Sequence, residues 1–148
     1  MGMSRRGAEV LRAGVAYCAL VFSAGFALGM VRVPFLVPRL GERIAELLEA
    51  PVMLVVIFLA SRHIVRRYGL ASSPSRALMV GVFALVLLAA AELLFMAVLQ
   101  GRPVADYVSN RDRISGSVYL ACLLLYALMP WLHARRIAGL RPNGMHVD

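Results

Sequence analysis

The stretch VRVPFLVPRLGERIAELLEAP, from Val31 to Pro51, lies between two strongly apolar runs and decides how the chain is organised. Arg32 follows an apolar run directly, and more charged residues then gather within eleven positions: Arg39, Glu42, Arg43, Glu46 and Glu49. Charges beside apolar runs are costly unless they are paired or reach water. The stretch therefore predicts a charged connection between two helices.

The composition of the whole chain places these helices in lipid. The chain has 148 residues, 61% of them hydrophobic, and a mean hydropathy of +0.77. A soluble core of this size cannot bury that much apolar surface. The sequence therefore predicts an all-α integral membrane four-helix bundle, with residues 1–148 as a single membrane domain.

The charge pattern also favours a membrane protein. Sixteen Arg and no Lys stand against eight acids, which gives a net charge of +8. The arginines lie at the ends of apolar runs and not in a patch interleaved with aromatic residues, so we expect no nucleic-acid partner. Cys18 and Cys122 have neither disulfide nor zinc spacing, so we predict no metal and no cofactor.

A membrane-spanning helix needs about 20 mostly apolar residues. Hydropathy predicts four spans, at about residues 13–33, 46–65, 76–100 and 114–133, and residues 137–148 as a short flexible tail. A cleaved signal peptide is the alternative for the first span, but the run is longer than an ordinary apolar core of about 7–15 residues.

The second span has a short uncharged core, from Ala50 to Ser61. It either takes in Glu46, Glu49, Arg62 and His63 at its ends, or residues 40–49 form a separate interfacial helix that is broken from the span near Pro51.

The arginines also predict the orientation. Ten of the sixteen lie in the N-terminus, the middle connection and the C-terminus, whereas the other six share the two remaining connections with five acids. The positive-inside rule then places both termini in the cytoplasm.

Three ionisable residues fall at a similar depth near the outer ends of their spans. Arg32 shares a helical face with Gly25 and Gly29, a GxxxG pattern that favours close helix packing. Glu92 is the sole charge inside the third span, and Glu49 lies near the outer end of the second. We predict a buried polar cluster of Arg32, Glu49 and Glu92.

Four supporting charges are expected above this cluster: Arg39, Glu42, Arg43 and Glu46. Glu42, Glu46 and Glu49 recur at helical spacing and form a carboxylate stripe. The cluster is either a structural ion-pair network or a site for a proton, an ion or a lipid headgroup.

Two further groups have weaker patterns. His63 and His133 both fall at the cytoplasmic boundary and could form a metal or proton-relay pair, although headgroup contacts also explain them. Tyr119, Cys122 and Tyr126 share a face of the fourth span with Ser115, as a packing stripe or within reach of the charged cluster.

The segments RVPFLVPRLGERIAELLEAPVML (residues 32–54) and SNRDRISGSVYLACLLLYALMPWL (residues 109–132) resemble a family of small, uncharacterised bacterial inner-membrane proteins with four spans. The resemblance implies a multi-pass location in the bacterial inner membrane and nothing about chemistry.

No GxSxG, HExxH, Walker A, GxGxxG or CxxCH motif is present. We therefore expect a non-enzymatic accessory, assembly or lipid-contacting component, with the bilayer and a second copy or another membrane protein as partners. The alternatives are an oligomeric transporter or proton or cation channel subunit that uses Glu92 and Glu49, with Arg32 tuning their pKa values, and a lipid-modifying enzyme.

Overall fold

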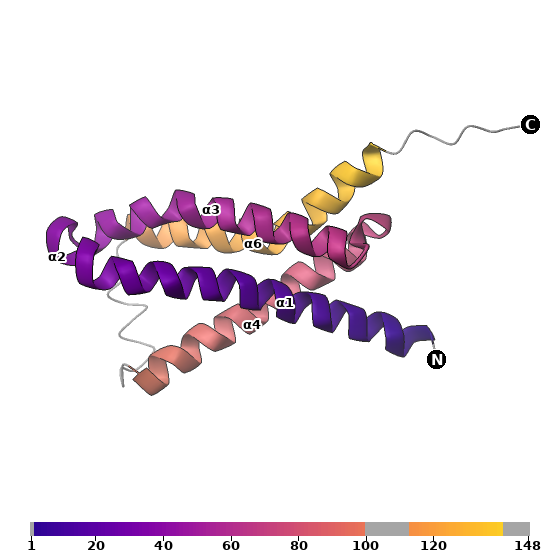
Figure 1. The fold of residues 1–148 in the computed structure, drawn as a ribbon, viewed down its shortest axis with the longest axis horizontal. Coiled ribbons are helices and arrows are strands. Elements are labelled where there is room, and N and C mark those ends of the chain that lie inside the picture. The colour runs from indigo at the N-terminus through magenta and orange to yellow at the C-terminus, as the bar shows by residue number, and fades with distance from the viewer. Residues whose placement is uncertain (1, 100–112, 141–148) are drawn as a thin grey trace, which may run out of the picture.

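The computed structural model describes residues 2–99 and 113–140 as an arrangement of long helices (Figure 1). The chain begins with α1 (Gly2–Val31), a π-helical segment η1 (Arg32–Leu36) and α2 (Val37–Leu40). It continues through α3 (Glu42–Arg67), the 3-10 turn η2 (Leu70–Ser72), α4 (Pro74–Leu99) and α6 (Arg113–Gly139). These described ranges contain no strand, so the all-α prediction is confirmed for them.

Among the described residues, four helical segments are long and apolar enough to cross a membrane, namely Arg5–Leu40, Glu42–Arg67, Pro74–Phe95 and Gly116–Gly139. Many large apolar side chains point outward, and Leu94 and Val98 are 65% and 73% exposed. An apolar surface this extensive is unfavourable in water and suits contact with lipid.

The helices contain the four predicted spans up to residue 99, and residue 100 lies outside the described residues. α6 continues to Gly139, so the first residues assigned to the flexible tail are helical. Residues 141–148 of that tail lie outside the described residues.

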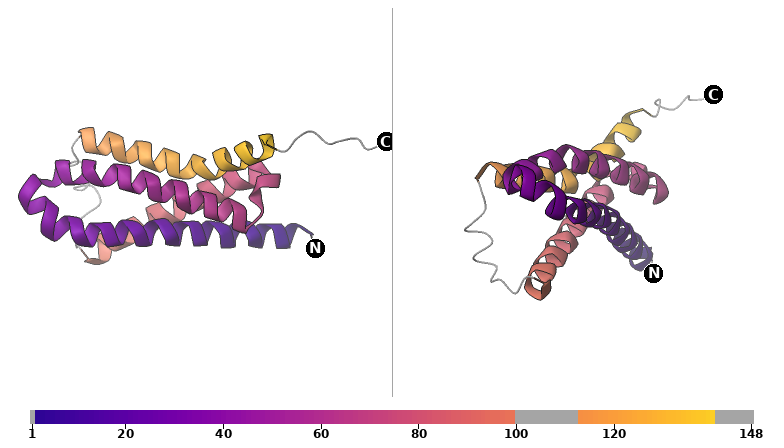
Figure 2. Two further views of the ribbon diagram at one scale, coloured as in Figure 1. Left: turned by 45° about the horizontal axis from the view of Figure 1, so that its top comes forward. Right: turned by 60° about the vertical axis from the view of Figure 1, so that its left-hand side comes forward.

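The helices run alternately up and down. Figures 1 and 2 show the start of α1, the α3–α4 connection and the end of α6 at one end of the molecule, with α2 and the start of α6 at the other. At the first end, Arg76 of α4 lies 3.6 Å from Glu9 of α1. We call these the terminal end and the α2 end.

The connection between α1 and α3 explains why the first reversal is so short. Pro34 and Pro38 lack a backbone N–H, so regular helical bonding is interrupted where η1 and α2 form. The chain then turns at Gly41, whose φ of +79° is a conformation that favours glycine. α3 passes through Pro51 without a break, so the alternative of a separate interfacial helix ending near Pro51 is wrong.

Aromatic stacking and close backbone approach hold the middle of the bundle together. The rings of Tyr17 and Tyr126 stack with centroids 4.5 Å apart, and the Tyr17 hydroxyl donates a 3.0 Å hydrogen bond to the Tyr126 carbonyl. A Cβ at Gly81 would lie only 1.9 Å from the carbonyl oxygen of Ala127. The absence of a side chain at Gly81 thus lets α4 and α6 meet closely.

Candidate functional site

A cavity of about 720 Å³ lies among α1, α3, α4 and α6 towards the α2 end. Its walls include apolar side chains from all four helices, among them Phe22, Met53, Leu88 and Leu123. It also contains every member of the predicted cluster, Arg32, Glu49 and Glu92. We call this space the charged cavity.

Arg32 occupies the first position of η1, where the first helix begins its turn towards α3. Its Nε lies 3.1 Å from Oε2 of Glu49, and its Nη1 lies 3.8 Å from Oε1 of Glu46. The three side chains are 28%, 16% and 19% exposed for Arg32, Glu49 and Glu46, respectively. Arg32 therefore binds two carboxylates that lie on one side of α3.

The ion pair leaves hydrogen-bonding capacity unused. Oε2 of Glu49 is buried and, although it is ion-paired with Arg32 at 3.1 Å, it accepts no hydrogen bond from a described residue. A buried carboxylate oxygen without a donor is unfavourable. This oxygen is thus available to a donor that enters the cavity.

Glu92 has a different partner. The hydroxyl of Tyr119, on α6, donates a hydrogen bond to Oε2 of Glu92, on α4. The ion pairs of Arg32 within residues 2–99 and 113–140 are those with α3. The structure therefore places Arg32, Glu49 and Glu92 around one cavity. They belong to two separate polar pairs: Arg32 pairs with Glu49 between η1 and α3, and Glu92 pairs with Tyr119 between α4 and α6.

The supporting charges divide into two sets. Glu42 and Glu46 line the charged cavity itself, whereas the sequence predicted all four supporting charges above the cluster. Arg39 and Arg43 are exposed and lie outside its lining. The cavity thus has four carboxylates and one guanidinium, which is a clear excess of negative charge.

Gly25 and Gly29 line the charged cavity and do not make the closest helix contacts. A Cβ at Gly25 would lie 3.6 Å from the Met53 methyl, an ordinary contact, and one at Gly29 would meet nothing within 4 Å. The tight positions are Gly81 and Gly14, where a Cβ would lie 2.5 Å from the Phe83 ring. Sequence spacing alone did not identify these two.

The two histidines do not form a pair. His133 is buried, its Nδ1 lies 3.0 Å from Ser61 Oγ and 3.1 Å from the Met129 carbonyl, and its ring packs on Phe58. His63 follows Ser61 by two positions on α3, so it points to another side of that helix. Within the described part of the chain, no three His, Cys, Asp or Glu side chains gather in a way that could hold a metal ion.

Tyr119 and Tyr126 were predicted only as a packing stripe or as residues within reach of the charges, and both line the charged cavity together with Cys122. The apolar wall near the α2 end of α4 was not predicted. There Phe26 of α1 and Phe95 of α4 meet edge to face, with centroids 6.0 Å apart.

Comparisons with protein-family models, with curated proteins and with solved structures found no match to this chain.

Proposed function

We propose that this chain is a non-enzymatic, multi-pass protein of the bacterial inner membrane that binds an amphipathic organic cation in the charged cavity. The four long apolar helices support the membrane location. The positive-inside rule supports cytoplasmic termini, because the terminal end carries most of the arginines. The charged cavity then lies in the outer half of the membrane.

The observation that carries the ligand class is the lining of the charged cavity. Glu42, Glu46, Glu49 and Glu92 face one guanidinium, that of Arg32, inside walls that are otherwise mostly apolar. Binding sites of this kind use apolar walls for affinity and a few polar groups for orientation. A molecule with an apolar body and an ammonium-like head satisfies both parts of the lining.

The aromatic residues strengthen this assignment. Phe22, Phe26, Phe95, Tyr119 and Tyr126 line the same cavity, and ring faces attract organic cations. The unused acceptor on Glu49 adds a place for an N–H donor.

Binding of radiolabelled tetraphenylphosphonium to the purified full chain in nanodiscs tests the proposal. We expect saturable binding that weakens about tenfold, or about 1.4 kcal/mol, in Glu49→Gln, because this variant removes one of the four carboxylates that face the cation. Glu9→Gln is the matched control, because Glu9 lies at the terminal end and outside the cavity. Non-saturable binding, or equal affinity in Glu49→Gln and the wild type, would contradict the proposal.

A transporter or proton or cation channel subunit is the second candidate, and it is favoured by the setting of Glu92. This carboxylate is bound by a neutral phenol, and the described residues give it no ion pair. Acidic side chains inside membrane spans mark candidate pathways for ions or protons. Four helices barely enclose a pathway, so this candidate also requires an oligomer. Proteoliposomes that show no cation-driven proton flux, or flux unchanged by Glu92→Gln, would exclude it.

A further inference from the structure

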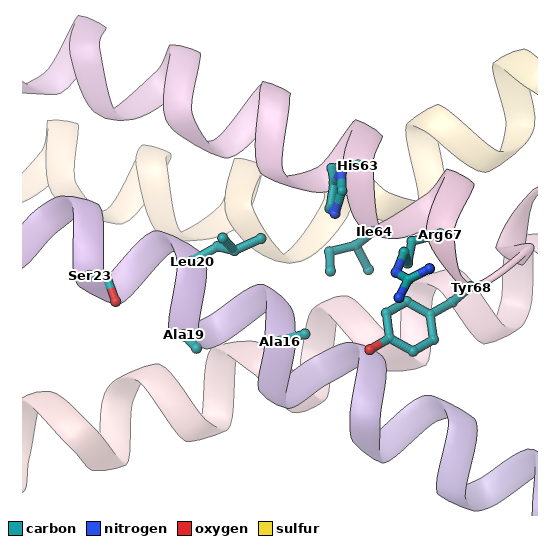
Figure 3. A pocket seen from close by; sticks show the side chains of 8 residues that line it. All are labelled: Ala16, Ala19, Leu20, Ser23, His63, Ile64, Arg67 and Tyr68. Carbon is teal, nitrogen blue, oxygen red and sulfur yellow. The ribbon is translucent and has the colours of Figure 1, made fainter.

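A second hollow, of about 400 Å³, lies between α1 and α3 away from the charged cavity (Figure 3). α1 contributes Ala16, Ala19, Leu20 and Ser23, which recur at helical spacing and form one face. α3 and the residue after it contribute His63, Ile64, Arg67 and Tyr68. We call this hollow the basic groove.

Charge distinguishes the basic groove from the charged cavity. None of the described residues that line it is acidic, whereas the guanidinium of Arg67 faces it. Arg67 belongs to the last turn of α3, next to Arg66. The groove therefore attracts anions, in contrast to the carboxylate-rich cavity at the other end.

The groove is also amphipathic along its length. Figure 3 shows Arg67 and Tyr68 over the Ala16 part of α1, with His63 and Leu20 further towards its middle. Ala16 and Ala19 have short side chains and leave room above α1, and Ile64 forms a buried floor. Arg67 and Tyr68 thus lie where α3 ends, and the apolar side chains of Ala19 and Leu20 lie further towards the middle of α1.

We propose that the basic groove binds one acidic phospholipid. Its phosphate lies against the Arg67 guanidinium and the Tyr68 hydroxyl, and one acyl chain follows Ala19 and Leu20 towards the middle of α1. A guanidinium matches phosphate oxygens with two parallel N–H donors, and acidic lipids are attracted to basic segments at the membrane surface. This proposal relies on the membrane location but not on a ligand in the charged cavity.

Native mass spectrometry of the full chain in mild detergent, titrated with phosphatidylglycerol or phosphatidylcholine, tests the proposal. We expect one tightly retained phosphatidylglycerol, with affinity about tenfold lower in Arg67→Gln, since one bidentate charged contact is lost. Ala19→Leu fills the acyl path without changing charge and should also weaken binding. Arg6→Gln removes an exposed charge at the same end and should leave binding unchanged.

Several results would overturn the proposal. Equal losses in Arg67→Gln and Arg6→Gln would mean diffuse attraction and not a site. Equal retention of phosphatidylcholine would show that the groove does not select lipids by charge. Wild-type affinity in Ala19→Leu would show that no acyl chain lies along Ala19. Effective competition by millimolar inorganic phosphate would assign the groove to free phosphate. The melting temperature of each variant, measured in the same detergent, confirms that the compared proteins are folded.

Discussion

Arg32 of η1 and Glu49 of α3 face each other across the first chain reversal, with Nε and Oε2 3.1 Å apart. Seventeen positions separate them in the sequence, and the turn at Gly41 brings them together. The pair joins the first two long helices in the wall of the charged cavity. Loss of either partner therefore affects both the stability of the bundle and the charge of the site.

Arg32→Ala should lower the free energy of unfolding by about 1–3 kcal/mol, because it leaves the Glu46 and Glu49 carboxylates half buried and unpaired. The double variant Arg32→Ala with Glu49→Gln should lose less than the sum of the single variants. Unfolding by sodium dodecyl sulfate in mixed micelles measures these differences. Strict additivity would show that the two residues are not coupled.

The same cycle with Glu92 in place of Glu49 serves as the matched comparison. We expect Arg32→Ala with Glu92→Gln to be closer to additive, because Glu92 is bound by Tyr119 and Arg32 by α3. Stronger coupling of Arg32 to Glu92 than to Glu49 would contradict the two-pair arrangement of the site.

Tyr119→Phe should lower the free energy of unfolding by about 1–3 kcal/mol, because it removes the hydroxyl that donates to Glu92. Adding Glu92→Leu should recover part of this loss, since an apolar side chain needs no donor. The mixed-micelle unfolding assay applies here too. Failure of Glu92→Leu to recover any stability would argue against the α4–α6 hydrogen bond.

Gly81→Ala should destabilise the protein far more than Gly29→Ala. A new Cβ would overlap the Ala127 carbonyl oxygen, and separating α4 from α6 should cost about 1–3 kcal/mol. Gly29→Ala is the control, because nothing lies within 4 Å of its added Cβ and alanine favours helix by up to about 1 kcal/mol. Equal stabilities of these two variants would contradict the close contact at Gly81.

Hydropathy was sufficient to predict the helical class and the approximate helix positions, because about 20 consecutive apolar residues have few other stable structures. The position of the first reversal was harder to predict. Proline disfavours a helix interior more than glycine does, so Pro51 is a stronger candidate for the reversal than Gly41. A proline can nevertheless remain inside a helix when packing supports it. Pro51 lies within α3, and the chain turns at Gly41 instead.

The polar residues of the site could be predicted from depth, because ionisable groups at a similar level tend to meet inside a bundle. Which of these residues pair could not be predicted, since the pairing depends on how each helix is rotated about its own axis. Arg32 is directed to α3, and Glu92 is directed to Tyr119 on α6. The GxxxG spacing at Gly25 and Gly29 likewise could not show that the close contact lies at Gly81.

Cys122 provides the most direct test of a cation-binding cavity, because it lines that space, is partly accessible, and is accompanied only by the buried Cys18. In a Cys18→Ala background, tetraphenylphosphonium should slow the reaction of Cys122 with N-ethylmaleimide several-fold. The protection should disappear when Glu49→Gln and Glu92→Gln are added, and Cys122→Ala in the same background reports any labelling that does not occur on cysteine. An unchanged labelling rate at saturating cation, or equal protection without the two carboxylates, would contradict the account.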